Sequence, residues 1–142
     1  MMNILFFLTP KSEVAYIYED YSVRQVLEKM EYHKYSAIPI ITRSGKYVGT
    51  ITEGDLLWSL KNQFNLNLKD VEEISIMNVS RRKDNRPVAI DANIEDLISK
   101  SMTQNFVPVI DDQDIFIGII KRREIIEYCY KKMNDVETNK IS

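Results

Sequence analysis

The sequence predicts an α+β fold built from two copies of one β-α-β-β-α unit. Pro39 and Pro108 are 69 residues apart, and so are Gly49 and Gly118. Around these positions, YSAIPII aligns with QNFVPVI, and KYVGTITEGDLL aligns with IFIGIIKRREII. An unbroken offset over about 30 residues indicates an internal duplication, so each half of the chain is expected to form one structural unit.

Each half is expected to open with a short strand, VAYIY (14–18) or PVAI (87–90), followed by a helix. The first helix begins with a capping-box pattern at Ser22 and Gln25, and the second begins with an N-cap at Asn93. Both helices then carry an apolar face, formed by Val23, Val26, Leu27 and Met30 in the first and by Ile94, Leu97, Ile98 and Met102 in the second.

Two further strands and a second helix complete each unit. AIPII and FVPVI are rich in β-branched residues, and the proline in each indicates a strand start or an edge. Turn residues at 42–45 and 111–114 precede the strands YVGTIT and IFIGII. The final helices have matching apolar stripes, formed by Leu56, Leu57, Leu60 and Phe64 and by Ile125, Ile126, Cys129 and Met133.

These elements divide the chain into four parts: a first repeat over 10–64, a connecting segment over 65–86, a second repeat over 87–134 and a flexible C-terminal tail over 135–142. Residues 1–8 either add a strand or cover an apolar surface.

Composition excludes several classes of function. Hydrophobic residues make up 44% of the 142 residues, which is ordinary for a globular domain. A net charge of −2 argues against general nucleic-acid binding. Cys129 is the only cysteine and His33 the only histidine, so a disulfide, a zinc site or a Ser-His triad is hard to build. The apolar run at 4–8 is too short to span a bilayer. We expect a cytoplasmic, non-enzymatic domain without catalytic residues, metal or cofactor.

The motifs resemble the CBS domain family. Its pattern is a strand ending in h-P-h-h (h, hydrophobic), a tight turn, and a strand with G-h-h-[TS]-x-x-D that leads into a helix. Gly49–Asp55 (GTITEGD) fits this pattern, while Gly118–Glu124 (GIIKRRE) fits its frame with Lys121 for Thr and Glu124 for Asp. The resemblance covers about residues 10 to 134. It implies a tandem CBS pair, or Bateman module, in which two repeats form a pseudo-twofold disc.

The resemblance also implies a function. Tandem CBS pairs bind adenine nucleotides (AMP, ADP, ATP) in clefts where one repeat's early strands meet the other repeat's motif loop. They commonly form homodimers through their helical faces. The sequence contains no effector domain, so we expect the nucleotide-bound module to signal in trans to an unidentified effector protein.

A narrower resemblance is to the stand-alone CBS pairs of the DarB/CbpB type, which bind cyclic di-AMP. KSEVAYIYEDYS, KYSAIPII and IFIGIIKRREII carry it. Glu13 departs from that pattern, which has a lysine there. An acid beside a phosphate opposes binding of a dianionic cyclic dinucleotide, unless nearby Lys11 substitutes for the lysine.

The resemblance implies two unequal pockets. Pocket one is expected to place early residues of repeat one opposite the cationic triplet, and consists of Val14, Ala15, Tyr35, Ser36, Ala37, Ile38, Pro39, Lys121, Arg122 and Arg123. Pocket two, the weaker one, consists of Val88, Ala89, Asn105, Phe106 and Val107 opposite Thr52 and Asp55. Cations at a helix N-terminus suit phosphate, and the Asp55 carboxylate suits ribose hydroxyls. Phe106 replaces the small Ala37 and is expected to reduce the space for a base.

Each of these residues also has a structural interpretation. Arg122 and Arg123 can lie in an exposed first helical turn, although cations there oppose the helix dipole and so favour an anionic ligand. Asp55 is an equally good helix cap, Thr52 a capping hydroxyl, and Tyr35 a half-buried aromatic residue. The alternative function is a nucleotide-independent interaction or dimerisation module, which the altered second motif and Phe106 favour.

Overall fold

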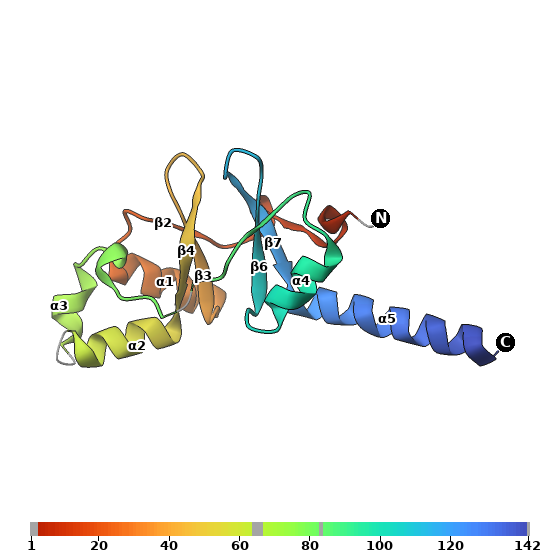
Figure 1. Cartoon of the computed structure of the whole chain (residues 1–142). Coiled ribbons are helices and arrows are strands. Elements are labelled where there is room, and N and C mark those ends of the chain that lie inside the picture. The colour runs from red at the N-terminus through yellow and green to blue at the C-terminus, as the bar shows by residue number, and fades with distance from the viewer. Residues whose placement is uncertain (1–2, 64–66, 83, 142) are drawn as a thin grey trace.

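The computed structural model describes residues 3–63, 67–82 and 84–141 and consists of two halves, each with a small sheet and flanking helices (Figure 1). Phe64, which ends the predicted first repeat and its apolar stripe, lies outside the described residues, as does Lys83. Among the helices of the described residues, none is long and apolar enough to cross a membrane.

The order of elements is that of the predicted duplication. The first half contains β2 (Ile17–Tyr18), α1 (Val23–His33), β3 (Ala37–Ile41), β4 (Tyr47–Thr52) and α2 (Glu53–Asn62). The second half contains β5 (Val88–Ala89), α4 (Ile94–Ser101), β6 (Phe106–Ile110), β7 (Phe116–Lys121) and α5 (Arg122–Ile141). The first sheet has the strand order β2-β3-β4, and the second has the order β1-β7-β6-β5, in which β1 is Thr9–Pro10.

Strand register confirms the 69-residue repeat. Ile40 pairs with Gly49 in the first hairpin, and Val109 pairs with Gly118 in the second. Both hairpins shift register at the next residue, between Ile40 and Ile41 and between Val109 and Ile110. The capping box at Ser22 and Gln25 and the N-cap at Asn93 are also confirmed.

The prolines lie within strands rather than at their starts. Pro39 is the third residue of β3, which is the central strand of its sheet. However, β2 pairs only with Ile40 and Ile41, so one side of β3 has no neighbouring strand at Pro39. Pro108 has the same position in β6, because β5 pairs only with Val109 and Ile110. Each proline therefore has the edge-like environment that the residue tolerates.

The opening strands and the C-terminal tail differ from the prediction, and the connecting segment contains two short helices. The opening strands β2 and β5 have two residues each, so they are shorter than the predicted 14–18 and 87–90. The connecting segment 65–86 contains α3 (Leu68–Glu72) and the 3-10 helix η3 (Ile76–Asn78), and its Val71, Ile76 and Val79 join the first hydrophobic core. The tail predicted to be flexible over 135–142 instead continues α5 to Ile141, because it contains no glycine or proline to end a helix.

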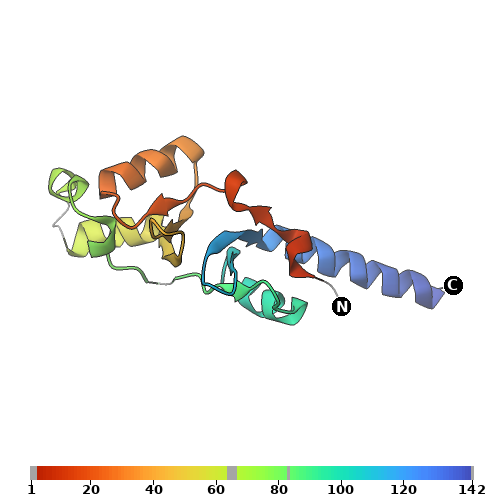
Figure 2. The same ribbon diagram turned by 90° about the horizontal axis from the view of Figure 1, so that it is seen from above.

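The N-terminal segment packs on the second half, although it precedes the first in sequence. The 3-10 helix η1 (Ile4–Phe7) places Ile4 in the second core with Ile125. The rings of Phe7 and Tyr128 meet edge to face with centroids 5.3 Å apart. Figure 2 shows this segment running beside the start of α5. Residues 4–10 therefore link the first repeat to the sheet of the second.

The two hairpins meet through their turns (Figure 1). Lys46 and Ile115 form an antiparallel bridge, and the Phe116 backbone N–H donates to the Gly45 carbonyl oxygen at 2.9 Å. A third apolar cluster then spans the halves, with Ile41, Phe106, Phe116 and Ile119 buried at its centre. These contacts set the distance between the repeats, and hence the space left between the ends of their sheets.

Candidate functional site

A cavity of about 290 Å³ lies where the two halves meet. We call it the inter-repeat cavity, and it is lined by Thr9, Glu13, Val14, Ala15, Tyr35, Ser36, Ala37, Pro39, Asn105, Phe106, Ile119, Lys121, Arg122 and Arg123. It brings residues from the start of the chain, from β3 and its preceding turn, and from the β7–α5 junction to one surface.

The inter-repeat cavity matches the composition predicted for pocket one. Every residue predicted for that pocket lines it except Ile38. Ile38 is fully buried in the first core, because side chains alternate between the two faces of a strand. Ala37 and Pro39 therefore face the cavity together while Ile38 faces the helices.

One side of the cavity is apolar and aromatic. Phe106 is 7% exposed and forms one cluster with Val14, Ala37 and Ile119. Tyr35 is 40% exposed at the rim, and its ring stacks on that of His33 with centroids 5.4 Å apart. A planar base can pack against this surface, because flat apolar walls with a few polar groups are typical of ligand sites.

The cationic triplet lies at the junction of β7 and α5, next to the apolar residues, since Lys121 pairs with Phe106. The Arg122 backbone N–H donates to the Asn105 carbonyl oxygen, and Arg122 Nε donates to the Gln104 carbonyl oxygen, both at 3.0 Å. Arg123 is far less constrained: its side chain is 88% exposed and pairs with Glu127 at 3.1 Å. Arg122 is therefore held in position, while Arg123 is free to turn towards a ligand.

The start of α5 differs chemically from the start of α2. Thr52 precedes α2 and its hydroxyl accepts from the Asp55 backbone N–H. Lys121 stands at the equivalent position before α5, and an ammonium group has no acceptor with which to cap a helix. The first-turn amides of α5 are therefore not capped by that side chain, and they add to the positive potential beside the cavity.

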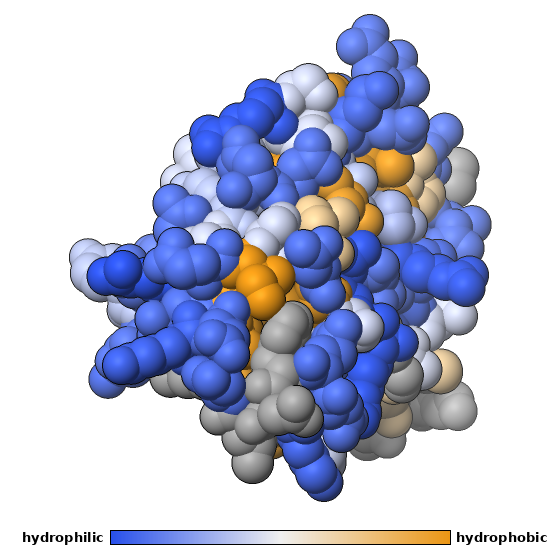
Figure 3. Space-filling model, turned by 90° about the vertical axis from the view of Figure 1, so that its left-hand side faces the viewer, coloured by the Kyte–Doolittle hydropathy of each residue, from blue (hydrophilic) through white to orange (hydrophobic). Residues whose placement is uncertain are grey.

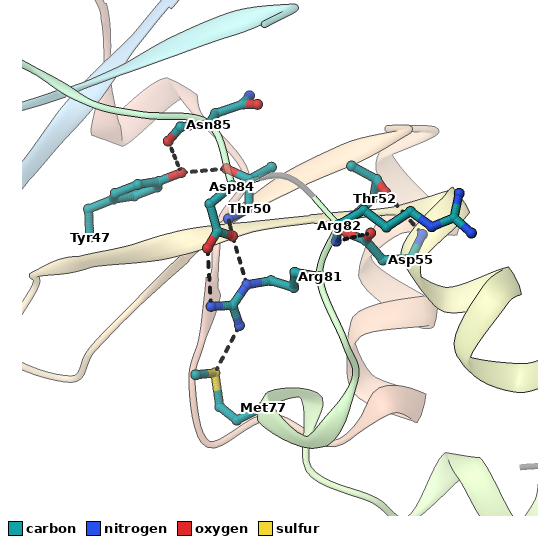
Figure 4. Close-up of polar contacts among 9 residues, drawn as sticks. All are labelled: Tyr47, Thr50, Thr52, Asp55, Met77, Arg81, Arg82, Asp84 and Asn85. Carbon is teal, nitrogen blue, oxygen red and sulfur yellow. Dashed lines mark hydrogen bonds and ion pairs between the residues drawn. The ribbon is translucent and has the colours of Figure 1, made fainter. Parts of the chain in front are cut away.

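Thr52 and Asp55, predicted for pocket two, form a helix cap instead. Asp55 Oδ2 accepts from the Thr52 backbone N–H at 3.0 Å, which completes a capping box. Its other oxygen, Oδ1, accepts from the Arg82 backbone N–H at 2.9 Å (Figure 4). Asp55 is only 2% exposed. Both carboxylate oxygens already accept hydrogen bonds, so Asp55 acts as a helix cap in this structure.

The connecting segment closes the space beside β4, as Figure 4 shows. Asp84 accepts from the Thr50 backbone N–H at 3.1 Å and pairs with Arg81 at 2.7 Å. The Tyr47 hydroxyl donates to the Asn85 carbonyl oxygen at 2.6 Å. A side chain at Gly49 would overlap the Asp84 carboxylate. Arg82 and Asp84 thus bond to residues of the first repeat's motif, Asp55 and Thr50.

The seven residues predicted for pocket two do not come together. Val88 and Val107 are buried in the second core. Ala89 is exposed and does not line the inter-repeat cavity. Asn105 and Phe106 line the inter-repeat cavity instead. Near the second cleft lies a polar cavity of about 490 Å³, which is lined by Arg82, Asp84, Asn85, Arg86, Thr103 and Gln104.

Strand pairing explains this error. Ile17 pairs with Ile40, and Val88 pairs with Val109, the residue 69 positions after Ile40. Val88 is therefore the counterpart of Ile17, an offset of 71 rather than 69. The counterparts of Val14 and Ala15 are then Asn85 and Arg86, which do line the second cavity. The prediction therefore chose the correct part of the second repeat but the wrong residues within it.

Three residues of the inter-repeat cavity, Thr9, Glu13 and Ile119, were assigned to neither predicted pocket. Thr9 and Ile119 pair with each other across β1 and β7. The available signal was Gly118, which has φ +154° and where a side chain would overlap the Thr9 carbonyl oxygen. The glycine indicates close approach of another backbone, but it does not identify which segment approaches.

A larger, apolar groove of about 680 Å³ opens between α1 and α2, and Tyr35 lines both this groove and the inter-repeat cavity. It is lined mainly by Val23, Leu27, Met30, Leu56, Leu57, Leu60, Val71 and Val79, with Glu31, Lys34 and Glu53 among its polar residues. Figure 3 shows this end of the molecule, with hydrophobic side chains gathered inside a hydrophilic surround. Leu57 is 57% exposed there.

Comparison with known proteins gives a family match. The family model described as CBS domain matches residues 7–62 and 71–131. The second match begins within the segment 65–86 that was predicted to be a connector. Uncharacterized protein MJ1225 of Methanocaldococcus jannaschii is 24% identical over 147 residues, which cover 92% of this chain and 50% of that protein. The chain thus spans half the length of this relative.

Similar solved structures include CbpB in complex with c-di-AMP, with 25% identity, a TM-score of 0.81, and coverage of 97% of this chain and 91% of CbpB. CbpB from Streptococcus agalactiae has 27% identity, a TM-score of 0.76, and coverage of 91% and 80%. CBSX2 in complex with AMP, at 20% identity and a TM-score of 0.73 over 94% and 99% of the two chains, shares the fold. The narrower resemblance, to CbpB-type proteins, is thereby confirmed.

Proposed function

Because the chain belongs to the CBS domain family, we propose that it is a regulatory module that binds an adenine nucleotide in the inter-repeat cavity and acts on a partner protein. The observation that carries the proposal is the composition of this cavity. Apolar residues, including Phe106, share the lining with Lys121, Arg122 and Arg123, which are three cations beside a helix N-terminus. Such a lining suits a molecule that has both a flat base and a phosphate.

Two similar structures support the ligand class. CbpB was solved with c-di-AMP and CBSX2 with AMP, both of which contain an adenine base joined to ribose and phosphate. In this chain, the base packs on Phe106 and Tyr35, and the phosphate binds at Lys121–Arg123. Placing three like charges side by side costs electrostatic free energy, and an anion between them relieves that repulsion.

Thermal unfolding of the purified protein with AMP, ADP, ATP and cyclic di-AMP tests the proposal. A ligand that binds only the folded state, at a hundred times its dissociation constant, adds about 2.7 kcal/mol to the free energy of unfolding. We expect at least one adenine nucleotide to raise Tm by several degrees, and UMP at the same concentration to leave it unchanged. Absence of a shift with every adenine nucleotide at millimolar concentration contradicts the proposal.

The cationic side of the cavity is tested with Arg123→Ala. Arg123 is exposed, so the free energy of unfolding is expected to change by less than about 0.5 kcal/mol. Loss of a charge-assisted hydrogen bond to phosphate is expected to weaken nucleotide binding roughly 10- to 100-fold in calorimetric titration. Lys132→Ala, an exposed cation further along α5, is the matched control and should bind normally. If Arg123→Ala and Lys132→Ala bound the nucleotide with equal affinity, the phosphate would not contact Arg123.

A second function, a nucleotide-independent interaction module, is favoured by a different observation. The apolar groove between α1 and α2 includes the exposed Leu57, on the face of the molecule that Figure 3 shows. Exposed apolar surface of this kind marks protein contacts. We propose that it forms the contact with a second copy of the chain, and both functions then coexist, with nucleotide bound at one surface and the partner copy at another.

A further inference from the structure

The acid expected at the ribose of the nucleotide site lies elsewhere. Glu124 is the counterpart of Asp55 in the 69-residue repeat and ends the motif GIIKRRE. It does not line the inter-repeat cavity. It lines a separate pocket with Phe7, Leu8 and Tyr128, and its Oε2 is buried without a hydrogen-bond partner among the described residues. The motif acid of the second repeat therefore faces the N-terminal segment.

A different acid faces the inter-repeat cavity. Among the described residues that line it, Glu13 is the only one with a carboxylate. It is exposed, so its charge is not already neutralised by a buried partner. The same cavity carries Lys121, Arg122 and Arg123, so one acid and three cations share the surface available to a ligand.

The backbone fixes Glu13 at this position. Pro10 pairs with Gly118 on β7, the strand that ends in Lys121. A short 3-10 turn, η2 (Lys11–Glu13), follows and is closed by the Val14 N–H donating to the Lys11 carbonyl oxygen at 3.1 Å. After Glu13 the chain enters the protein at Ala15, which is 8% exposed. Glu13 is thus anchored on both sides, by β7 before it and by the buried chain after it.

We propose that Glu13 accepts hydrogen bonds from the free 2′ and 3′ hydroxyls of the ribose, so that the cavity selects an adenosine mononucleotide over cyclic di-AMP. This inference rests on the proposed nucleotide site. An ionised carboxylate only accepts hydrogen bonds, and a ribose diol offers it two donors. In the cyclic dinucleotide each 3′ oxygen is esterified, so each ribose offers one donor only.

The charge of the ligand and the size of the cavity also favour a mononucleotide over cyclic di-AMP. A cyclic dinucleotide brings two phosphodiester charges, and a charge near Glu13 is repelled by its carboxylate. A mononucleotide places its one phosphate at the cationic side and its sugar at the acid. The cavity of about 290 Å³ is also at the small end of the roughly 300–1,000 Å³ that ligand pockets span, which suits one nucleoside rather than two.

The experiment is a calorimetric titration of wild-type protein and Glu13→Gln with AMP, 2′-deoxy-AMP, 3′-deoxy-AMP and cyclic di-AMP. Wild-type protein is expected to bind AMP at least about tenfold more tightly than either deoxy analogue or cyclic di-AMP, as loss of a hydrogen bond to a charged group predicts. In Glu13→Gln the preference for AMP over the deoxy analogues is expected to shrink, while binding of cyclic di-AMP strengthens.

Controls separate this inference from the proposed function. Glu95→Gln, an exposed acid in the first turn of α4, should reproduce every wild-type affinity, and thermal melts of both variants without ligand should match wild-type protein. If AMP binds but its preference over the deoxy analogues is the same in Glu13→Gln, the assignment of Glu13 is wrong and the nucleotide site stands. If wild-type protein binds cyclic di-AMP as tightly as AMP, the selectivity is wrong. Binding of none of the four compounds overturns both.

Discussion

At the scale of single residues, position in the structure separates side chains that look alike in sequence. Asp55 and Glu124 occupy the same place in the repeat, yet Asp55 caps a helix and Glu124 enters a pocket beside Phe7. Arg122 and Arg123 are neighbours, yet one is held by the Gln104 carbonyl oxygen and the other is exposed. Residue type alone therefore does not give the environment, and the environment decides which charges a ligand can reach.

Tyr47 predicts a pH dependence of stability. Burial raises the pKa of Tyr47 well above the ordinary value for tyrosine, and its hydroxyl bonds the Asn85 carbonyl oxygen. In the unfolded chain Tyr47 ionises from about pH 10, while the folded protein keeps the proton. Above pH 10 the unfolded state therefore binds fewer protons, so this contribution to the free energy of unfolding is fully present below pH 10 and is lost as the pH rises further.

Urea unfolding of wild-type protein and Tyr47→Phe between pH 8 and about pH 11 measures this effect. At pH 8 the variant is expected to be less stable by about 1 kcal/mol, the typical contribution of a hydrogen bond. The difference between the two proteins should narrow above pH 10, because only wild-type protein loses the Tyr47 contribution. A difference that stays constant across the range would show that the hydroxyl does not retain its proton.

At the scale of secondary-structure elements, the two repeats keep one plan but end their motif strands differently. β4 leads into α2 through the reciprocal Thr52–Asp55 cap, whereas β7 leads into α5 through Lys121, which cannot accept a hydrogen bond. The first helix start is capped by its own side chains, whereas the first amide of α5, that of Arg122, bonds to the Asn105 carbonyl oxygen. The connecting segment reinforces this difference, since Arg82 bonds to Asp55 and Asp84 bonds to Thr50.

Asp55→Ala distinguishes the cap from a ribose contact. The substitution removes the acceptor for two backbone N–H groups, those of Thr52 and Arg82, and is expected to cost roughly 1–3 kcal/mol of unfolding free energy. Nucleotide affinity of the folded variant is expected to stay at the wild-type value.

Asp96→Ala is the matched control for this substitution. Asp96 caps α4 by accepting from the Asn93 backbone N–H alone, so its loss should cost less than that of Asp55, about 1 kcal/mol or below. Urea unfolding and calorimetric titration of both variants give the two quantities. If Asp55→Ala weakened nucleotide binding and left the free energy of unfolding unchanged, Asp55 would be a ligand contact rather than a cap.

At the scale of the whole molecule, the two halves present different surfaces. The inter-repeat cavity is small and cationic, while the groove between α1 and α2 is larger and apolar. The hairpin turns join the halves through the Lys46–Ile115 bridge, and residues 4–10 join them again through β1. Thr9 of β1 pairs with Ile119 of β7 and lines the cavity, so the segment that connects the halves forms part of the cavity wall.

Leu57→Asp tests the groove as the contact with a second copy. Leu57 is 57% exposed, so a monomer should tolerate the charge, but a dimer that buries this face should not. We expect wild-type protein to be a dimer in size-exclusion chromatography with light scattering and Leu57→Asp to be a monomer with wild-type nucleotide affinity. Asn62→Asp places the same new charge on α2 outside the groove and should leave the dimer intact. A monomeric wild-type protein at high concentration would exclude this contact.

The sequence alone determined the duplication, the central strands and the cationic character of one cleft. These features rest on local patterns: a 69-residue offset, β-branched runs bounded by turn residues, and charges next to a strand end. They required no knowledge of which distant segments meet. Most of pocket one followed from them, because its residues lie within the repeated motifs and the early segment of the first repeat.

Only the tertiary structure decided that Glu124 lies outside the inter-repeat cavity and that the connecting segment bonds to Asp55 and Thr50. Glu13 reaches the cavity because β1 pairs with β7, and Asp84 reaches Thr50 because the connecting segment runs along β4. Both depend on contacts between residues far apart in sequence. The prediction matched Val14 and Ala15 with Val88 and Ala89, whereas strand pairing matches them with Asn85 and Arg86. Local patterns give elements, whereas the route of the segments between them decides which side chains share a site.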